Sequence, residues 1–354
     1  MKLLYFTKTS EEGPSSRYRV YQYLPYLRST GIEVCVRPLF GATYFKVLSL
    51  PRPAAIIFKA IYAPVRFLKR FMDLLIMGRV DLLVVEGQLF PYLPPIVERI
   101  LVWAKLKLVI ELDDAIYLTT LHGRKIPRLM ASAAGVIAGN NTIAEYARPY
   151  TKHVHVIPTV VDTKRFHPSV SSRPAPERVL TVGWIGLPYN FGYLHLIREA
   201  LRRVQALVQM QFRVISSHPP DLPGVNVEFR RWSLDTEVED LQDCQLGVMP
   251  LDDDRWARGK CGLKLLQYMA MGIPAVASPV GVNKEIIKDG KNGFWATSEE
   301  EWFKRLMQLC QDSPLRATMG QAARQTIVEQ YSLETWAPRL GTLYRHLAAK
   351  PVDA

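Results

Sequence analysis

The sequence predicts an α/β protein with two domains, each a doubly wound parallel sheet. Three observations support this prediction. Short apolar runs alternate with helix-length segments, which is the pattern of parallel strands joined by crossover helices. The alternation is interrupted once, by a proline- and serine-rich stretch, and then starts again. The length of 354 residues exceeds the size at which single hydrophobic cores usually stop growing, so two domains are expected.

The expected strands fall into two groups on either side of a linker near Pro158–Glu177, which includes the proline- and serine-rich stretch Ser169–Pro176. The first group is Lys2–Phe6, Val34–Pro38, Asp81–Glu86, Leu108–Leu112, Gly135–Ala138 and His153–Ile157. The second is Arg178–Trp184, Gln211–Ile215, Val225–Phe229, Leu246–Met249 and Ala275–Ala277. Ligands of open parallel sheets bind outside the carboxyl ends of the strands, so the loops that follow these strands are the expected sites.

The net charge of +12 indicates an anionic partner, which can be nucleic acid, an acidic membrane surface or a phosphorylated substrate. The chain carries no recognised nucleic-acid-binding motif, which disfavours the first. Four scattered cysteines suit reduced thiols in a cytoplasm. His153 and His155 alternate as in a strand and have no third ligand nearby, so no metal site is expected. The longest apolar region, Val47–Val65, is interrupted by charges and prolines, so no membrane-spanning helix is expected either.

The most informative stretch runs from Lys260 to Gly281 and continues through Gly293. Gly262 is expected to open a helix whose free amides and positive dipole end suit a phosphate, and Lys260 and Lys264 add full positive charge. Gly272 is expected to end this helix, and Gly290 and Gly293 to frame a turn. On these residues alone, the alternative to a phosphate site is an ordinary strand–helix unit with a glycine-capped helix.

This stretch resembles the donor-binding signature of glycosyltransferase family 4, with Met269-Ala-Met-Gly-Ile-Pro followed by Glu285 and Asp289-Gly-Lys-Asn-Gly. Val156-Ile-Pro-Thr-Val-Val-Asp, Val182-Gly-Trp-Ile-Gly, Leu246-Gly-Val-Met-Pro-Leu and Tyr331-Ser-Leu-Glu-Thr-Trp are similar to other family segments, in the same order. The resemblance implies a GT-B fold, with an acceptor domain over residues 1–165, a nucleotide-sugar domain over 166–335 and a terminal helix, 336–354, that packs back on the first domain.

The resemblance also implies the activity, which is transfer of a hexosyl-type sugar, with retention, from a nucleoside-diphosphate sugar to a lipid-linked or polysaccharide-precursor acceptor, without metal or other cofactor. Lys264, Lys260 and Asp113 are the expected catalytic residues. The expected donor-binding residues are Gly13, Arg17, Gly183, Trp184, Gly186, Arg230, Trp232, Arg258, Gly262, Leu263, Gln267 and Glu285. A plain surface loop around Gly13 and a helix cap at Asp113 are the alternative interpretations.

The segment Tyr44–Arg79 interleaves seven basic residues with phenylalanines, as in basic amphipathic segments that bind anionic bilayers. We therefore expect a cytoplasmic protein that is peripheral on the inner face of the membrane. A solvated helix face with aromatic residues in the core is the alternative interpretation. The basic residues are Lys46, Arg52, Lys59, Arg66, Lys69, Arg70 and Arg79, and the phenylalanines are Phe45, Phe58, Phe67 and Phe71.

The match departs from the family at two points. Gly259 and Gln267 stand where many members carry two glutamates, and Trp184-Ile-Gly-Leu replaces the usual arginine and lysine that grip the diphosphate. Glutamine still offers hydrogen bonds to a ribose, whereas glycine offers none to a sugar. The alternatives to a transferase are therefore a sugar-nucleotide epimerase of the same fold and a non-catalytic partner subunit.

Overall fold

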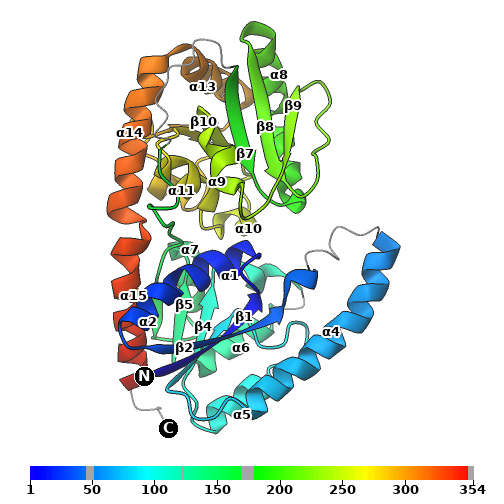
Figure 1. The fold of residues 1–354 in the computed structure, drawn as a ribbon, viewed down its shortest axis with the longest axis vertical. Coiled ribbons are helices and arrows are strands. Elements are labelled where there is room, and N and C mark those ends of the chain that lie inside the picture. The colour runs from blue at the N-terminus through cyan, green and yellow to red at the C-terminus, as the bar shows by residue number, and fades with distance from the viewer. Residues whose placement is uncertain (45–51, 121–122, 169–178, 350–354) are drawn as a thin grey trace. The chain divides into compact units, whose positions relative to one another are not determined.

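The computed structural model describes residues 1–44, 52–120, 123–168 and 179–349. The chain folds as two compact units, and each collects separate stretches of sequence (Figure 1). Unit 1 contains Met1–Thr159, Gly259–Cys261 and Trp336–Ala354, and unit 2 contains Val160–Arg258 and Gly262–Thr335. The stretch Ser169–Pro176 and the residues Phe45 and Lys46 lie outside the described residues.

Unit 1 is built on a six-stranded sheet in which every pair of neighbouring strands is parallel, with the order β2-β1-β3-β4-β5-β6. Its strands are β1 (Lys2–Thr9), β2 (Glu33–Phe40), β3 (Leu82–Glu86), β4 (Leu108–Leu112), β5 (Gly135–Ala138) and β6 (Val154–Val156). All five residues of β3 and of β4 are buried, as expected for central strands covered on both faces. The order reverses between β1 and β3, which is the switch point where such sheets bind ligands.

The helices of unit 1 are α1 (Pro14–Arg19), α2 (Leu24–Ser29), α4 (Arg52–Leu75), α5 (Ile96–Trp103), α6 (Lys125–Ser132) and α7 (Asn141–Ala147), with short 3-10 turns at Tyr21–Tyr23 and Ile116–Leu118. The last helix of the chain, α15 (Leu333–Ala349), joins them through its residues from Trp336 onward. The buried Tyr344 hydroxyl of α15 is hydrogen-bonded to the Tyr5 hydroxyl in β1. Leu347 packs against Gly135 in β5. The chain's last helix is therefore a structural part of its first unit.

Unit 2 repeats the architecture with the strand order β12-β11-β10-β7-β8-β9, again all parallel. Its strands are β7 (Leu180–Ile185), β8 (Met210–Ser216), β9 (Val227–Arg231), β10 (Leu246–Met249), β11 (Ala275–Ala277) and β12 (Phe294–Trp295). The switch point here lies between β7 and β10. The expected fold class and all eleven expected strands are thus confirmed, and β12 was missed because two residues carry no periodicity.

The helices of unit 2 are α8 (Arg198–Leu207), α9 (Glu237–Gln242), α10 (Arg255–Arg258), α11 (Leu263–Ala270), α12 (Asn283–Ile286), α13 (Glu299–Gln311) and α14 (Ser313–Gln330), with a 3-10 segment at Pro188–Ile197. Trp184 and Trp302 are the largest side chains of the core between the sheet, α8 and α13. Gly272 has φ +71° and follows α11 as its expected stop, and its amide donates to the Met269 carbonyl. Gly290 donates to the Gly293 carbonyl in the expected turn.

Helix α4 turns Arg66 and Arg70 toward the rest of unit 1, so these two basic residues do not contribute to an exposed basic face. Arg70 is buried and donates to the carbonyls of Thr7 (2.7 Å) and Arg37, and burial lowers the pKa of its guanidinium to about 9. Arg66 donates to the carbonyls of Pro38 (3.0 Å) and Leu39. Lys69 pairs with the buried Asp73. The side chains of Arg52 and Lys59 lie outside what the structure describes. Among the described residues, no helix is long and apolar enough to cross a membrane.

Candidate active site

Helix α11 is seated on the sheet of unit 2 by the buried Tyr268. The Tyr268 hydroxyl accepts a hydrogen bond from the Ile185 amide of β7, at 3.1 Å. Its ring lies on Gly247 of β10, where an added Cβ would come within 2.3 Å of the ring. Glycine at this strand position is therefore required by the close approach of the ring. Side chains four residues apart share a helix face, so the anchoring of Tyr268 also fixes the backbone position from which the Lys264 side chain extends.

Lys264 lies in the first turn of α11, next to the loop that follows β7. Its Nζ is 5.2 Å from the centre of the Trp184 ring, a cation–π distance. Gly186 leaves the space that both side chains use, since an added Cβ would lie 2.7 Å from the Trp184 ring and 2.9 Å from Lys264 Cε. Trp184 is 2% exposed, so the ring cannot yield. The structure thus brings three expected residues together at the switch point of unit 2.

Gly262 caps α11 with φ +71°, a left-handed conformation that favours glycine. Gly262 provides no side-chain capping hydrogen bond, and a Cβ added there would lie 2.6 Å from Ile286 Cδ1. The amide end of an eight-residue helix, with Leu263 and Lys264 in its first turn, therefore has the features of an anion site. Gln267 follows on the same helix but is only 3% exposed. The donor-binding roles expected for Gly262, Leu263 and Gln267 remain predictions.

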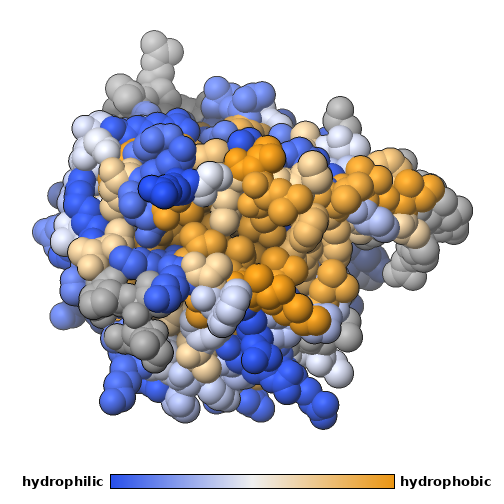
Figure 2. Space-filling view, turned by 90° about the horizontal axis from the view of Figure 1, so that it is seen from below, coloured by the Kyte–Doolittle hydropathy of each residue, from blue (hydrophilic) through white to orange (hydrophobic). Residues whose placement is uncertain are grey.

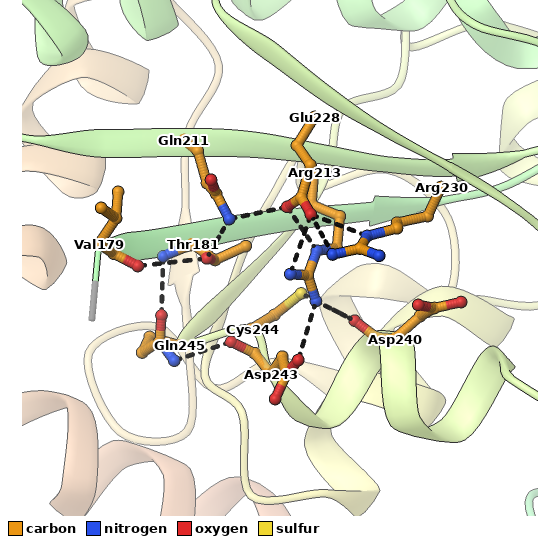
Figure 3. A network of polar contacts seen from close by, with 10 residues as sticks. All are labelled: Val179, Thr181, Gln211, Arg213, Glu228, Arg230, Asp240, Asp243, Cys244 and Gln245. Carbon is orange, nitrogen blue, oxygen red and sulfur yellow. Dashed lines mark hydrogen bonds and ion pairs between the residues drawn. The ribbon is translucent and has the colours of Figure 1, made fainter. Parts of the chain in front are cut away.

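Arg230 and Trp232 are held by acidic side chains of unit 2. Figure 3 shows Arg230 turned toward Glu228, which also pairs with the buried Arg213 of β8. Arg213 reaches further to the Asp240 carbonyl and the Asp243 carboxylate, which ties β8, β9 and α9 together. The Trp232 indole donates to the buried Glu237 at 2.9 Å. A role for Arg230 in holding a phosphate would require it to leave Glu228.

Three more expected donor residues are placed within unit 2. Arg258 is exposed and donates to Asp253 at 2.6 Å. Glu285 is exposed on α12. Gly183 lies inside β7, where an added Cβ would come within 2.5 Å of the Cys244 sulfur. The need for glycine at this position is therefore explained by packing, and its role toward a donor remains a prediction.

In unit 1 the loop after β1 is tied to the switch point by a buried carboxylate. Glu86, the last residue of β3, accepts hydrogen bonds from Ser16 Oγ (2.6 Å) and the Lys8 amide (3.0 Å). Ser16 Oγ in turn bonds the amide and hydroxyl of Thr9. Gly13 precedes α1, and its amide closes a turn on Ser10. The glycine-containing loop expected to lie near the donor is thus fixed to the sheet by Glu86.

Two arginines follow Gly13 in α1. Arg19 is 1% exposed and pairs with Glu111 of β4 at 2.8 Å, so its charge is already matched inside the protein. Arg17 is buried as well, and its Nη1 donates to the Glu11 carbonyl. Its predicted contact with the donor is untested.

The three residues Gly259–Cys261 group with unit 1, where Asn140 and Asp113 hold them. Asn140 Nδ2 donates to the carbonyls of Gly259 (2.8 Å) and Lys260 (3.2 Å), and the Cys261 thiol donates to the Asp113 carbonyl (3.0 Å). A Cβ added at Gly259 would lie 2.5 Å from that of Ala115. The position at which the family resemblance leads one to expect a glutamate therefore has no room for a side chain here. Lys260 and Asp113 belong to this cluster, and Lys264 does not.

Sequence reasoning missed Glu86 and Glu111, which carry the polar contacts at the carboxyl ends of β3 and β4. The available signal was a glutamate within or ending a strand that is otherwise apolar, Leu82-Leu-Val-Val-Glu and Leu108-Val-Ile-Glu-Leu. Burial, together with the nearby Asp113 charge, raises the pKa of Glu86 to about 7. Burial also raises the pKa of Glu111, against the lowering effect of Arg19. Within the described residues no three His, Cys, Asp or Glu side chains are grouped as a metal site.

Comparison with known proteins identifies the segment that contains α11. Residues 176–312 match the family "Glycosyl transferases group 1". Two curated relatives match shorter segments: N-acetyl-alpha-D-glucosaminyl L-malate synthase of Bacillus anthracis is 32% identical over 85 residues (23% of this chain), and D-inositol 3-phosphate glycosyltransferase of Corynebacterium urealyticum is 34% identical over 94 residues (26% of this chain). In each case the match spans 22% of the relative's own length.

Solved structures match the whole chain. HepE of Anabaena in complex with UDP and glucose superposes with a TM-score of 0.74 at 16% identity, covering 98% of this chain and 100% of its own. Sucrose-phosphate synthase of Thermosynechococcus elongatus gives 0.70 at 14% identity, covering 99% of both chains. At this identity the matches show the fold, which is GT-B as expected. Residues 176–312 are thus similar to the group 1 glycosyl transferases, and the whole chain has the GT-B fold.

Proposed function

We propose that the protein is a retaining glycosyltransferase that moves a hexosyl group from a nucleoside-diphosphate sugar to a lipid-linked or polysaccharide-precursor acceptor. The observation that carries this proposal is the placement of Lys264, which the ring of Trp184 and the anchored helix α11 hold at the N-terminal end of that helix, beside Gly262. A cation held at the amide end of a helix suits a diphosphate. This arrangement lies within the segment that matches the family.

In the proposed reaction the bond between the anomeric carbon and the donor phosphate oxygen breaks, and the nucleoside diphosphate leaves with the electron pair. The acceptor oxygen forms its new bond to the same face of the sugar, and its proton passes to the departing phosphate oxygen. Lys264 and the amides of α11 stabilise the charge that develops on the diphosphate. Such preorganised stabilisation is usually the largest catalytic contribution that a site of this kind makes.

Uridine diphosphate is the proposed leaving group, because the HepE structures contain UDP and UDP-glucose. The closed position at Gly259 removes one side chain that relatives direct to the sugar, so the donor sugar is expected to be held by fewer polar contacts from that segment. This departure is also the reason to test turnover and binding separately.

The test is a panel of UDP- and GDP-sugars, measured by titration calorimetry for binding and by nucleotide release with product detection for turnover. Binding of a UDP-sugar with turnover on an added lipid-linked acceptor supports the proposal. A sugar that binds, but is not transferred to any acceptor tried, favours a non-catalytic subunit. Conversion of one nucleotide sugar into its epimer without an acceptor identifies an epimerase instead.

A further inference from the structure

The apolar surface of helices α4 and α5 is the largest feature of unit 1 that the proposed reaction leaves unused. On α4 five side chains are between 50% and 67% exposed and follow one another at intervals of four and three residues: Ile61, Val65, Leu68, Met72 and Leu75. Intervals of this kind place them along one face of the helix. On α5 the residues Ile96, Ile100 and Trp103 repeat the spacing, and Trp103 is 85% exposed.

Helix α4 is amphipathic in the reverse sense to a water-exposed surface helix. At about 100° per residue, Arg66, Arg70 and Asp73 share one face, and the five exposed apolar residues lie on the opposite one. The charged face is the one that contacts the protein, through the carbonyls of Thr7, Pro38 and Arg37. The apolar face of α4 therefore points away from the protein. Its exposure is not explained by a need to keep the charged face in water, because the charged face is the one that packs against unit 1.

The two helices form one continuous surface. Figure 1 shows α5 beside the C-terminal part of α4, and Figure 2 shows a continuous apolar patch on this side of unit 1 that extends along the projecting helix. Tyr92 (67% exposed) and Leu93 (47% exposed) are further exposed apolar side chains, in the loop that joins β3 to α5. Soluble monomers rarely expose apolar patches of more than a few hundred Å², and larger ones mark interaction surfaces.

The exposed charges around the apolar patch are positive, which favours an anionic partner. From residue 60 to residue 107, the exposed cations are Lys69, Arg79, Arg99 and Lys105. The acidic residues of this stretch are Asp73, Glu86 and Glu98, which are buried, and Asp81, which is exposed but accepts from the Lys2 amide. Pairing of two copies through this face would bring like charges together. An anionic bilayer both covers the apolar side chains and matches the cations.

We infer that α4 and α5 insert their exposed apolar side chains into the surface of an anionic lipid bilayer, with Trp103 and Tyr92 at the level of the lipid headgroups, where such amphipathic rings accumulate. This inference deepens the proposed function, since it brings the enzyme to the surface that holds a lipid-linked acceptor. It differs from the expectation drawn from the sequence, because apolar insertion carries the binding, whereas Arg66 and Arg70 have structural roles.

The experiment is flotation of the full chain with phosphatidylglycerol-containing vesicles and with pure phosphatidylcholine vesicles. We expect strong binding to the first and at least about tenfold weaker binding to the second. Changing Leu68 and Ile100 to aspartate should lower binding by about tenfold or more. The matched control changes Leu207 and Val328 of unit 2 to aspartate, since both are exposed apolar residues and the charge added is the same; it should leave binding almost unchanged.

A second measurement does not depend on the aspartate variants. Vesicles with brominated acyl chains should quench the fluorescence of the native protein more than that of Trp103→Phe. Flotation requires no turnover, so an inactive protein that still floats contradicts only the proposed function. Equal binding to both vesicle types, an equal loss in the Leu207/Val328 control, or a lipid-free dimer that the Leu68/Ile100 variant abolishes would overturn the inference.

Discussion

The ammonium of Lys264 lies over the indole of Trp184, with 5.2 Å between Nζ and the ring centre. Trp184 is part of the unit 2 core, so the ring is a fixed platform. A cation over an aromatic face contributes about 0.5–2 kcal/mol, depending on its desolvation. This contact restricts a side chain that would otherwise sample many rotamers, and it makes Lys264 a preorganised group rather than a mobile surface lysine.

Replacing Lys264 by alanine should therefore lower kcat by about a hundredfold or more, the order lost when one preorganised charge-stabilising group is removed. The free energy of unfolding should change by less than about 1 kcal/mol. Initial rates and urea unfolding measure the two effects. Lys304→Ala, on the exposed side of α13, is the control. Normal turnover in Lys264→Ala would remove the diphosphate role from this lysine.

Replacing Gly186 by alanine should disturb the same site without changing any charge. The added methyl group would lie 2.7 Å from the buried Trp184 ring and 2.9 Å from Lys264, so one of them must shift. We expect turnover to fall by about tenfold or more. Gly192→Ala is the matched control, because nothing lies within 4 Å of a Cβ added there. Equal kinetics in the two variants would show that the position of Lys264 is unimportant.

Glu86 should make stability depend on pH in a definite direction. Burial raises the pKa of its carboxyl from 4.5 to about 7, so the folded protein holds this proton more tightly than the unfolded chain does. The resulting stabilisation is complete below pH about 4.5 and is lost as the pH rises through about 7, a change on the order of 3 kcal/mol.

The measurement for Glu86 is urea unfolding at pH 5 and pH 8. The native protein should lose more free energy of unfolding between these values than Glu86→Gln, which cannot titrate. Glu145→Gln, at an exposed position on α7, should behave like the native protein. If the free energy of unfolding changed equally between pH 5 and pH 8 in the native protein and in Glu86→Gln, the raised pKa of Glu86 would be contradicted.

Arg19 and Glu111 form a buried ion pair, so removing one partner leaves an unmatched charge. Arg19→Met should lower the free energy of unfolding by about 3–5 kcal/mol, and the double change to Arg19→Met with Glu111→Leu should recover much of it. Chemical denaturation measures both. Glu33→Gln breaks the exposed pair with Lys2 and should cost less than about 1 kcal/mol. A double variant less stable than Arg19→Met would refute the buried-charge explanation.

Turnover should persist in excess chelator, because lysine and helix amides supply the positive charge that a metal supplies elsewhere. Initial rates before and after chelation, and after re-addition of Mg²⁺ or Mn²⁺, measure this. Complete loss that either ion restores would show that a metal assists the departure of the diphosphate.

The sequence predicted strands and helix caps well because they depend on local patterns. Apolar runs fixed the positions of β3 and β4, and the glycine at 262 marked the start of α11. The contacts that matter most at the site join residues far apart: Arg19 and Glu111 are separated by 92 positions, and no local periodicity pairs them. For α4 the periodicity predicted a helix, but not which of its faces packs against the protein. The fold shows that it is the charged face.

The contact between Tyr5 and Tyr344 has a consequence for how the protein is made. Residue 5 leaves the ribosome well before residue 344, yet both are fully buried in unit 1. The first unit therefore cannot complete its core until the second unit, which lies between them in the sequence, has been synthesised. In the meantime the positions around Gly135 that receive Leu347 stay uncovered, so the nascent chain exposes an aggregation-prone apolar surface until α15 has emerged.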